Sequence, residues 1–223
     1  MSDHPSLNPA DQPSDAPSQQ MLVDRAFVAT IMKRCIDDRG ARAALRSGLG
    51  KTLDRVPRMH TIVAPLLPDW TMGKPDVQRA YYTVASVIAL LPSDQIQDTQ
   101  EHFGPEGSNT GRYGQSLGRT LAEAVTSGTR KGIRESAAET RINLLTKQSV
   151  EGLHRHLPST LRQLQGAGVP VDYARLIKDL RNWRRYRGDI SRYWLQDFYR
   201  ARFKADLEAA QQAGSEANAA PQT

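Results

Sequence analysis

The sequence predicts an all-α fold of two packed helical bundles with disordered tails. Apolar residues recur at helical spacing through most of the chain, and no segment alternates as a strand would. Residues 104–118 contain five glycines in fifteen positions, which predicts a loop between two halves. We therefore expect an N-terminal bundle over residues 21–104, a Gly-rich linker over 105–118 and a C-terminal bundle over 119–205.

The two ends of the chain are poor in apolar side chains. Residues 1–20 contain four prolines and almost nothing that could form a core, so burial cannot offset the entropy lost on ordering. Residues 206–223 include the run AAQQAGSEANAAPQT, which is typical of a frayed terminus. Both segments are predicted to be disordered.

The spacing of apolar residues predicts the first two helices of the N-terminal half. Phe27, Ile31 and Cys35 lie at helical intervals and predict one helix. A second helix is predicted over residues 41–56, with a stop near Pro57.

An apolar helix is predicted in the middle of the chain. The run YYTVASVIALL follows Pro75, has Asp76 as a plausible N-cap and stops at Pro92. Its β-branched residues also permit a strand, but its length and flanking residues favour a buried helix.

The C-terminal half is also helical by pattern. Helices are predicted over residues 119–126 and 136–165, the second kinked at Pro158. Residues 166–170 (GAGVP) predict a turn, and Asp172 is placed to cap the next helix.

The chain then forms an αα-hairpin with an aromatic core. Its first helix has an apolar face of Tyr173, Leu176, Ile177, Leu180 and Trp183, opposite a basic face of Arg175, Lys178, Arg181 and Arg185 that is expected to be solvated. Gly188 is predicted to end this helix and Asp189 to cap the next. The second helix has an apolar face of Ile190, Tyr193, Trp194 and Phe198. Such a stripe is more typical of a core than of a base-stacking surface.

The charge of the chain is concentrated in its body. The net charge is +6, but residues 21–203 hold 29 basic and 18 acidic side chains. Of the 30 basic residues, 23 are Arg and 7 are Lys. Arg grips phosphate with a planar fork, so the ratio suits a polyanionic partner, although a codon preference would produce it equally well.

Composition excludes several classes of protein. No apolar run approaches the ~20 residues of a membrane helix, and the first twenty residues lack the features of a secretory signal. The single cysteine, Cys35, excludes an intrachain disulfide framework and a Cys-rich zinc module. We expect a soluble, cytoplasmic protein.

Two short motifs resemble catalytic ones. Gly50-Lys51-Thr52 matches the end of a phosphate-binding loop, but Leu45 stands where that loop needs glycine. Residues 114–118 (GQSLG) match the nucleophile elbow of serine hydrolases, and His154 or His156 with Asp172 could complete a triad. Both motifs require a preceding strand, and none is predicted. We therefore expect no catalytic residues.

A metal site is not expected either. His154 and His156 are two residues apart on a helix, so their rings project about 200° apart and cannot bind one ion. His156 lies on the apolar stripe and is predicted to pack, whereas His154 is predicted to be solvated. Cys35 is interpreted as a small core residue, and no cofactor is expected.

Basic residues suggest a surface that contacts phosphates. The candidate nucleic-acid-binding residues are Arg42, Arg46, Lys51, Arg119, Arg130, Lys131, Arg134, Arg141 and Lys147. No helix-turn-helix pair, zinc finger or aromatic RNA-binding strand is visible, so these residues would follow a phosphate backbone without reading its bases. An ordinary charged surface is the alternative interpretation.

Several segments carry a family resemblance. They are Gly114–Ala124 (GQSLGRTLAEA), Glu139–Leu145 (ETRINLL), Val169–Arg200 with its D-x-x-x-L-x-x-D-L-x-x-W and W-x-x-D-F-Y motifs, and, upstream, ARAALRSGLG and YYTVASVIALLP. Together they resemble CasB, the small subunit of the type I-E CRISPR surveillance complex, Cascade. The resemblance covers about residues 22–203.

This resemblance implies an all-helical, non-catalytic subunit present as a pair. The implied partners are the backbone and large subunits of Cascade, guide RNA, the target and displaced DNA strands, and a second copy of the chain. Arg46, Arg119 and Arg141 occupy arginine positions of the matching motifs, and Lys147 follows Arg141 on the same helix. The implied role is stabilisation of the R-loop and its displaced strand in antiviral defence. The alternative is a helical interaction module that docks partners and guide RNA without touching a DNA strand.

Overall fold

The computed structural model describes residues 19–103, 114–126 and 132–219. This part of the chain is helical and contains no strand, which confirms the predicted fold class. Residues 1–18 of the tail expected over residues 1–20 and most of the Gly-rich linker lie outside the described residues, as do Arg130 and Lys131. Gln19 and Gln20, expected in the tail, are helical. Among the described helices, none is both long enough and apolar enough to cross a membrane.

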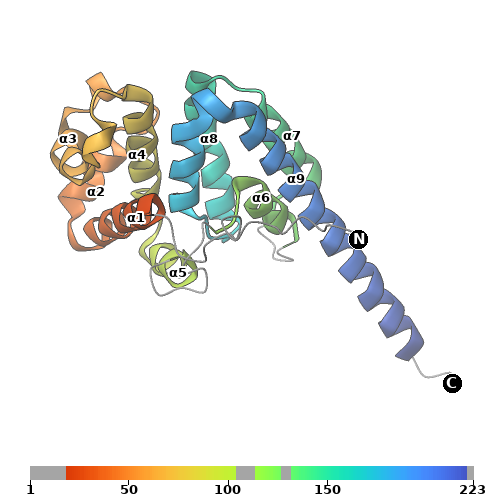
Figure 1. The fold of residues 1–223 in the computed structure, drawn as a ribbon. Helices are drawn as coiled ribbons and strands as arrows, with labels where there is room; N and C mark the ends of the chain where they lie inside the picture. The colour runs from red at the N-terminus through yellow and green to blue at the C-terminus, as the bar shows by residue number, and fades with distance from the viewer. Residues whose placement is uncertain (1–18, 104–113, 127–131, 220–223) are drawn as a thin grey trace, which may run out of the picture.

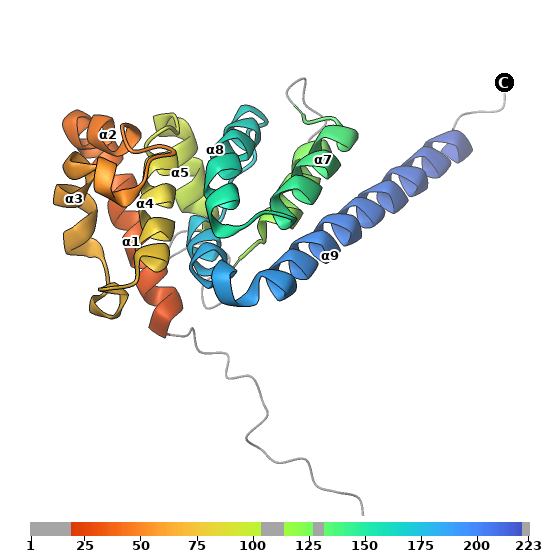
Figure 2. The same cartoon turned by 90° about the horizontal axis from the view of Figure 1, so that it is seen from above.

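Nine α-helices follow one another along the described residues. They are α1 (Gln19–Asp37), α2 (Arg39–Arg46), α3 (Pro57–Val63), α4 (Pro75–Ile88), α5 (Ser93–Phe103), α6 (Leu117–Thr126), α7 (Glu135–Thr146), α8 (Val150–Gly166) and α9 (Tyr173–Ala219). Helices α1 to α5 lie at one side of the molecule and α6 to α8 at the other, and the start of α9 runs between them (Figure 1 and Figure 2). Every one of these helices contributes buried apolar side chains to one continuous core.

The prediction for residues 41–56 is wrong beyond Arg46. Helix α2 begins at Arg39, before the expected start at Ala41, because Asp38 accepts hydrogen bonds from the backbone N–H groups of Gly40 and Ala41 at 2.8 and 2.9 Å. It ends early, in a turn where Gly50 has a positive φ of 72°. Only glycine adopts that conformation readily, so the periodicity of the flanking residues does not continue the helix.

The apolar mid-chain helix is present as α4, with a different start. Pro75 occupies its first position, where a missing N–H costs nothing, and Asp76 lies in the first turn rather than at the cap. The helix buries Tyr81, Val84 and Ile88 completely. It is the central helix of the N-terminal half.

The helix expected over residues 136–165 is two helices, α7 and α8. A short turn separates them, and the Ser149 hydroxyl accepts a hydrogen bond from the N–H of Gly152 at 3.2 Å. Pro158 lies inside α8. The turn after α8 forms as predicted, with Gly168 at a φ of 71°.

The start of α9 also follows the prediction. The Asp172 carboxylate accepts a hydrogen bond from the N–H of Arg175 at 2.8 Å, so Asp172 is the helix cap. The apolar face predicted for this first part, from Tyr173 to Trp183, is buried.

The break in the final hairpin lies at Tyr186 and not at Gly188. Tyr186 has φ −123° and ψ 28°, and the chain re-enters helical geometry directly after it. We call the residues before Tyr186 the first arm of α9 and those after it the second arm. The bend lies at an edge of the molecule (Figure 2).

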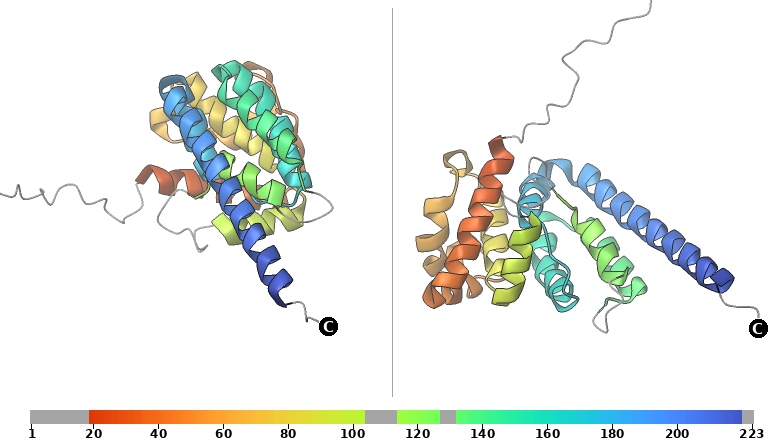
Figure 3. Two further views of the ribbon diagram at one scale, coloured as in Figure 1. Left: turned by 90° about the vertical axis from the view of Figure 1, so that its right-hand side faces the viewer. Right: turned by 90° about the horizontal axis from the view of Figure 1, so that it is seen from below.

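The second arm extends to Ala219, whereas a disordered tail was expected from residue 206. It projects beyond the other helices in every view (Figure 1 and Figure 3). Ala, Gln and Glu are good helix formers, and Arg202–Asp206 and Lys204–Glu208 are ion pairs one helical turn apart. Low apolar content therefore did not prevent helix formation here.

Candidate nucleic-acid interface

Two of the candidate arginines bind the end of a neighbouring helix. Arg46 donates from Nε to the carbonyl oxygen of Ala89 at 2.7 Å, and Arg42 donates to the same oxygen at 3.1 Å and to that of Leu91. These carbonyls follow the last turn of α4, where backbone acceptors lack helical partners and the dipole is negative. Arg42 and Arg46 therefore join α2 to α4. Lys51 is exposed in the turn after α2.

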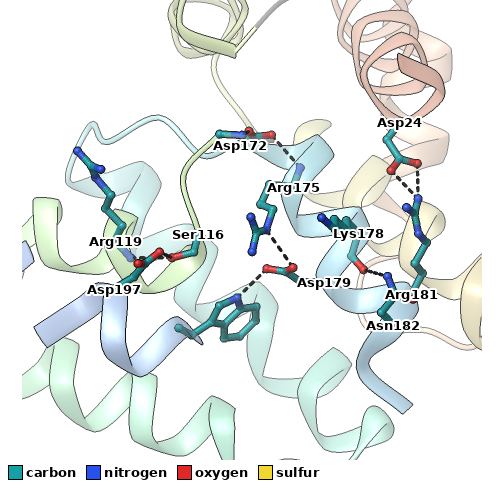
Figure 4. A network of polar contacts seen from close by, with 12 residues as sticks. Asp24, Ser116, Arg119, Asp172, Arg175, Lys178, Asp179, Arg181, Asn182 and Asp197 are labelled. Atoms are coloured by element: carbon teal, nitrogen blue, oxygen red, sulfur yellow. Dashed lines mark hydrogen bonds and ion pairs between the residues drawn. The ribbon is translucent and has the colours of Figure 1, made fainter. Parts of the chain in front are cut away.

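The serine of the GQSLG motif has a structural role at the start of α6. Ser116 is buried, donates to Asp197 on α9 at 2.6 Å and accepts from the N–H of Arg119 at 3.2 Å (Figure 4). It thus caps α6 and ties this helix to the second arm of α9.

Arg119 lies on the first turn of α6 at the edge of a shallow groove. Its Nε contacts Glu123 at 3.1 Å, and its side chain is 58% exposed. The groove between α6 and α9 has a volume of about 440 Å³ and is lined by the charged residues Arg119, Arg200, Lys204, Glu123, Asp197 and Glu208. Equal numbers of cations and anions line it, so this groove is not a purely basic track.

The remaining candidates lie on and around α7. Arg134 is exposed at the N-cap position, and Lys147 is exposed directly after the last turn. Arg141 is half-buried and donates to the Ser159 hydroxyl on α8 at 2.9 Å. The structure therefore distributes the predicted residues over α2, α6 and α7.

A buried ion pair that sequence reasoning missed connects the two sides of the molecule. Arg181 on α9 donates to Asp24 on α1 at 2.7 Å, and the Tyr81 hydroxyl on α4 donates to the same carboxylate at 2.7 Å. Asp24 is 0% exposed, and Arg181, expected to be solvated, is largely buried. Burial, with the nearby Asp24 carboxylate, raises the pKa of Tyr81. No spacing rule links residues so far apart in sequence.

A second buried group lies beside the bend. Arg175 contacts Asp179 at 3.0 Å, and the other oxygen of Asp179 accepts from the Trp194 indole at 2.7 Å (Figure 4). Burial raises the pKa of Asp179, and Arg175 opposes that change. The four-residue spacing of Arg175 and Asp179 is a signal that could have indicated this pair.

The predictions for the two histidines are reversed. His154 is buried, with its Nδ1 2.9 Å from the Thr83 hydroxyl on α4, while His156 is partly exposed. Burial, aided by Arg79, lowers the pKa of His154 to about 4. In the part of the chain that is described, no group of three or more His, Cys, Asp or Glu residues could hold a metal ion.

Cys35 is buried in the core, as predicted. Burial raises the pKa of its thiol to about 11, although Arg42 and Arg46 act in the opposite direction. The thiol is therefore protonated at neutral pH and a poor nucleophile.

Known proteins share both the sequence pattern and the fold. The family described as CRISPR-associated protein Cse2 matches residues 41–199. A CRISPR-associated protein Cse2 of Thermus thermophilus is 26% identical over 163 residues, which make up 72% of this chain and 79% of the relative.

Solved structures give the same result. A chain of a CRISPR RNA-guided surveillance complex is 30% identical, with a TM-score of 0.70 and coverage of 85% of this chain and 99% of that chain. M. ruber CasB, known from a crystal structure, is 22% identical, with a TM-score of 0.63 and coverage of 83% of this chain and 97% of that chain. The two proteins share the fold.

Proposed function

The chain belongs to the Cse2 (CasB) family of CRISPR-associated proteins, and from this premise we propose that it is the non-catalytic small subunit of a type I-E Cascade. The observation that carries the proposal is the match to a chain of a CRISPR RNA-guided surveillance complex, which spans 99% of that chain. Its partners would be the backbone and large subunits, guide RNA, and a second copy of itself. Such a subunit acts in antiviral defence in the cytoplasm.

We further propose that this subunit stabilises the R-loop through contacts with the displaced DNA strand that do not depend on base sequence. The exposed side chains of Arg119, Arg134 and Lys147 support this role. Strand exchange is nearly balanced in free energy, so a modest grip on the displaced strand shifts it toward the open state. Contacts to phosphates suffice, because every target differs in sequence.

The test uses a reconstituted complex with Arg119, Arg134 and Lys147, all exposed, changed to Ala. We expect the complex to assemble, and the displaced strand to become several-fold more accessible to a single-strand nuclease. A matched control removes three exposed charges elsewhere, with Lys33, Arg34 and Arg58 changed to Ala. Equal protection of the strand in both variants would contradict the strand-binding role.

One observation favours the alternative function of a protein-interaction subunit. The groove between α6 and α9 carries acidic and basic side chains in equal number, which suits a protein surface better than a phosphate backbone. In that case the triple variant would fail to assemble, while any complex that did form would open duplex DNA normally.

A further inference from the structure

The sequence around the bend of α9 is rich in basic residues. Between Lys178 and Arg192 the sequence has six basic and two acidic side chains. The non-helical geometry of Tyr186 interrupts the helix here, and Arg184, Arg185 and Arg187 are all exposed. None of these arginines is among the candidates that the sequence motifs indicate.

The segment leading into α4 extends the same surface. The ion pair between Arg184 and Asp76 holds the first turn of α4 against the bend. Just before that turn, Lys74 lies 5.3 Å from the ring centre of Trp70, and Arg181 of α9 lies 5.7 Å from it. Figure 1 and Figure 2 show the bend and this segment at one edge of the molecule. We call the surface formed by Trp70, Lys74, Arg184, Arg185, Tyr186 and Arg187 the α9 corner.

Two aromatic rings are exposed within these cations. Trp70 is 39% exposed and Tyr186 is 44% exposed, and the Arg185 guanidinium lies 5.2 Å from the Tyr186 ring centre. The other tryptophans, Trp183 and Trp194, are buried. Exposed rings beside cations can stack on bases while the cations contact phosphates.

The charges of the corner are only partly neutralised. Asp76 pairs with Arg184, Glu151 acts on the same guanidinium, and Asp189 pairs with Arg192. Among the described residues, no acidic side chain forms an ion pair with Lys74, Arg185 or Arg187. Three cations are therefore available to an external anion.

We propose that the α9 corner binds single-stranded nucleic acid, with phosphates on Lys74, Arg185 and Arg187 and unpaired bases on Tyr186 and Trp70. Cations interleaved with exposed rings are the arrangement that binds single strands without reading sequence. Paired bases in a duplex do not offer their faces to such rings. DNA and RNA strands share this chemistry, and both are included in the test.

The first experiment measures the charge contribution in the isolated full-length chain. Fluorescence polarisation measures the binding of labelled oligo-dT and oligo-U, each about 20 nucleotides long, over a range of salt concentrations. Changing Arg185 and Arg187 together to Ala should weaken binding and reduce the slope of log K against log salt by about 1.4, or about 0.7 for each lost phosphate contact. The control with Lys33 and Arg34 changed to Ala removes the same charge from α1. A loss with either strand supports the proposal, and a loss no larger than that of the control with both strands overturns it.

The second experiment separates stacking from charge. Tyr186→Ala should weaken binding to oligo-dT at least about fivefold, whereas Tyr186→Phe keeps the ring and should retain most of the affinity. With an abasic strand of equal length, the two variants should bind alike. Equal affinities of the two variants for oligo-dT would overturn the stacking role. Circular dichroism of both variants checks that the helix content of the original chain is retained.

These measurements are independent of the proposed function. They use the isolated chain and residues at the bend, whereas the strand-protection experiment uses the assembled complex and residues on α6 and α7. A corner that fails to bind would leave the strand-protection result unaffected.

Discussion

The two arms of α9 contain similar numbers of cations, but most of the partly or fully buried cations lie in the first arm. In the first arm, Arg175 and Arg181 are 15% and 9% exposed and contact carboxylates inside the molecule. In the second arm, Arg192 and Lys204 are 67% and 77% exposed and pair with acidic residues on the same helix. The first arm runs between the two sides of the molecule, which cover Arg175 and Arg181 but leave Arg184 and Arg185 near the bend exposed (Figure 2).

This difference shows what a helical wheel leaves out. A helical wheel places the charges of the first arm on the side opposite its apolar face, and a charged face of this kind is normally solvated. Here Asp24 from α1 approaches that face and forms a buried ion pair. The predictions below test how far the two arms differ, beginning with the largest expected effect.

Replacing Asp24 with Ala should strongly destabilise the protein. Arg181 would then lie largely buried without this counter-charge, and the Tyr81 hydroxyl would lose its acceptor. We expect a loss of about 3–5 kcal/mol in the free energy of unfolding, measured with urea. Asp189→Ala, which breaks the exposed pair with Arg192 in the second arm, should cost no more than about 0.5 kcal/mol. Similar losses for the two variants would contradict the contrast between the arms.

The stability of the protein should also depend on pH through the buried His154. Because the folded protein holds the pKa of His154 near 4, below its ordinary value of 6.5, the unfolded chain binds more protons between these values. Stability should therefore fall as the pH is lowered from 6.5 to 4, by up to roughly 3 kcal/mol from this residue.

The His154→Gln variant provides the comparison for this acid response. It should be less sensitive over the same pH window in thermal denaturation. Burial raises the pKa values of Asp172 and Asp179, which has the opposite effect on stability, but the original protein and the variant share this effect. Parallel pH profiles would show that His154 is not the source.

Two glycines test the packing of the second arm. A Cβ on Gly118 of α6 would lie 1.9 Å from the backbone oxygen of Trp194, so Gly118→Ala should cost about 1–3 kcal/mol by forcing the helices apart. A Cβ on Gly188 meets nothing within 4 Å, so Gly188→Ala should stabilise the helix by about 0.5–1 kcal/mol. Urea denaturation of both variants measures the difference. Equal destabilisation would mean that the second arm needs flexibility at Gly188.

The smallest effect is expected from removing the end of the second arm. A chain that stops after Ala205 loses Asp206, but Arg202 keeps its contact with Glu135 at 3.0 Å. We expect a weaker helical signal in circular dichroism and a free energy of unfolding within about 0.5 kcal/mol of the full chain. A larger loss would show that the projecting helix supports the body of the protein.

Patterns local in sequence predicted the fold well. The buried face from Tyr173 to Trp183 and the cap at Asp172 follow from spacing and side-chain chemistry within a few residues. The boundary between α7 and α8 was missed because Lys147, Gln148 and Ser149 include neither Gly nor Pro. The helical end of α9 was missed because low apolar content predicts disorder, whereas helix-forming residues and ion pairs along the helix favour order here.

The candidate site was harder to predict, because the contacts and burial of a charged side chain depend on residues far away in the sequence. Arg42 and Arg46 carry the expected charge, but the carbonyls they bind lie more than forty residues away. His154 and His156 were assigned opposite surroundings because the sequence does not show which helix covers which side of α8. Trp70 and Asp76 are close to the cations of α9 only through tertiary contacts, with Arg181 and Arg184 respectively.

The two buried tryptophans give the bend an optical signature. Trp183 belongs to the first arm and Trp194 to the second, and their ring centres are 5.1 Å apart with a 41° angle between the planes. Indoles so close and so oriented couple their electronic transitions, which should produce a pair of opposite-signed bands in circular dichroism. The amplitude of that pair depends on the angle between the arms. Straightening of α9 in any assembly would therefore be visible spectroscopically, without a label.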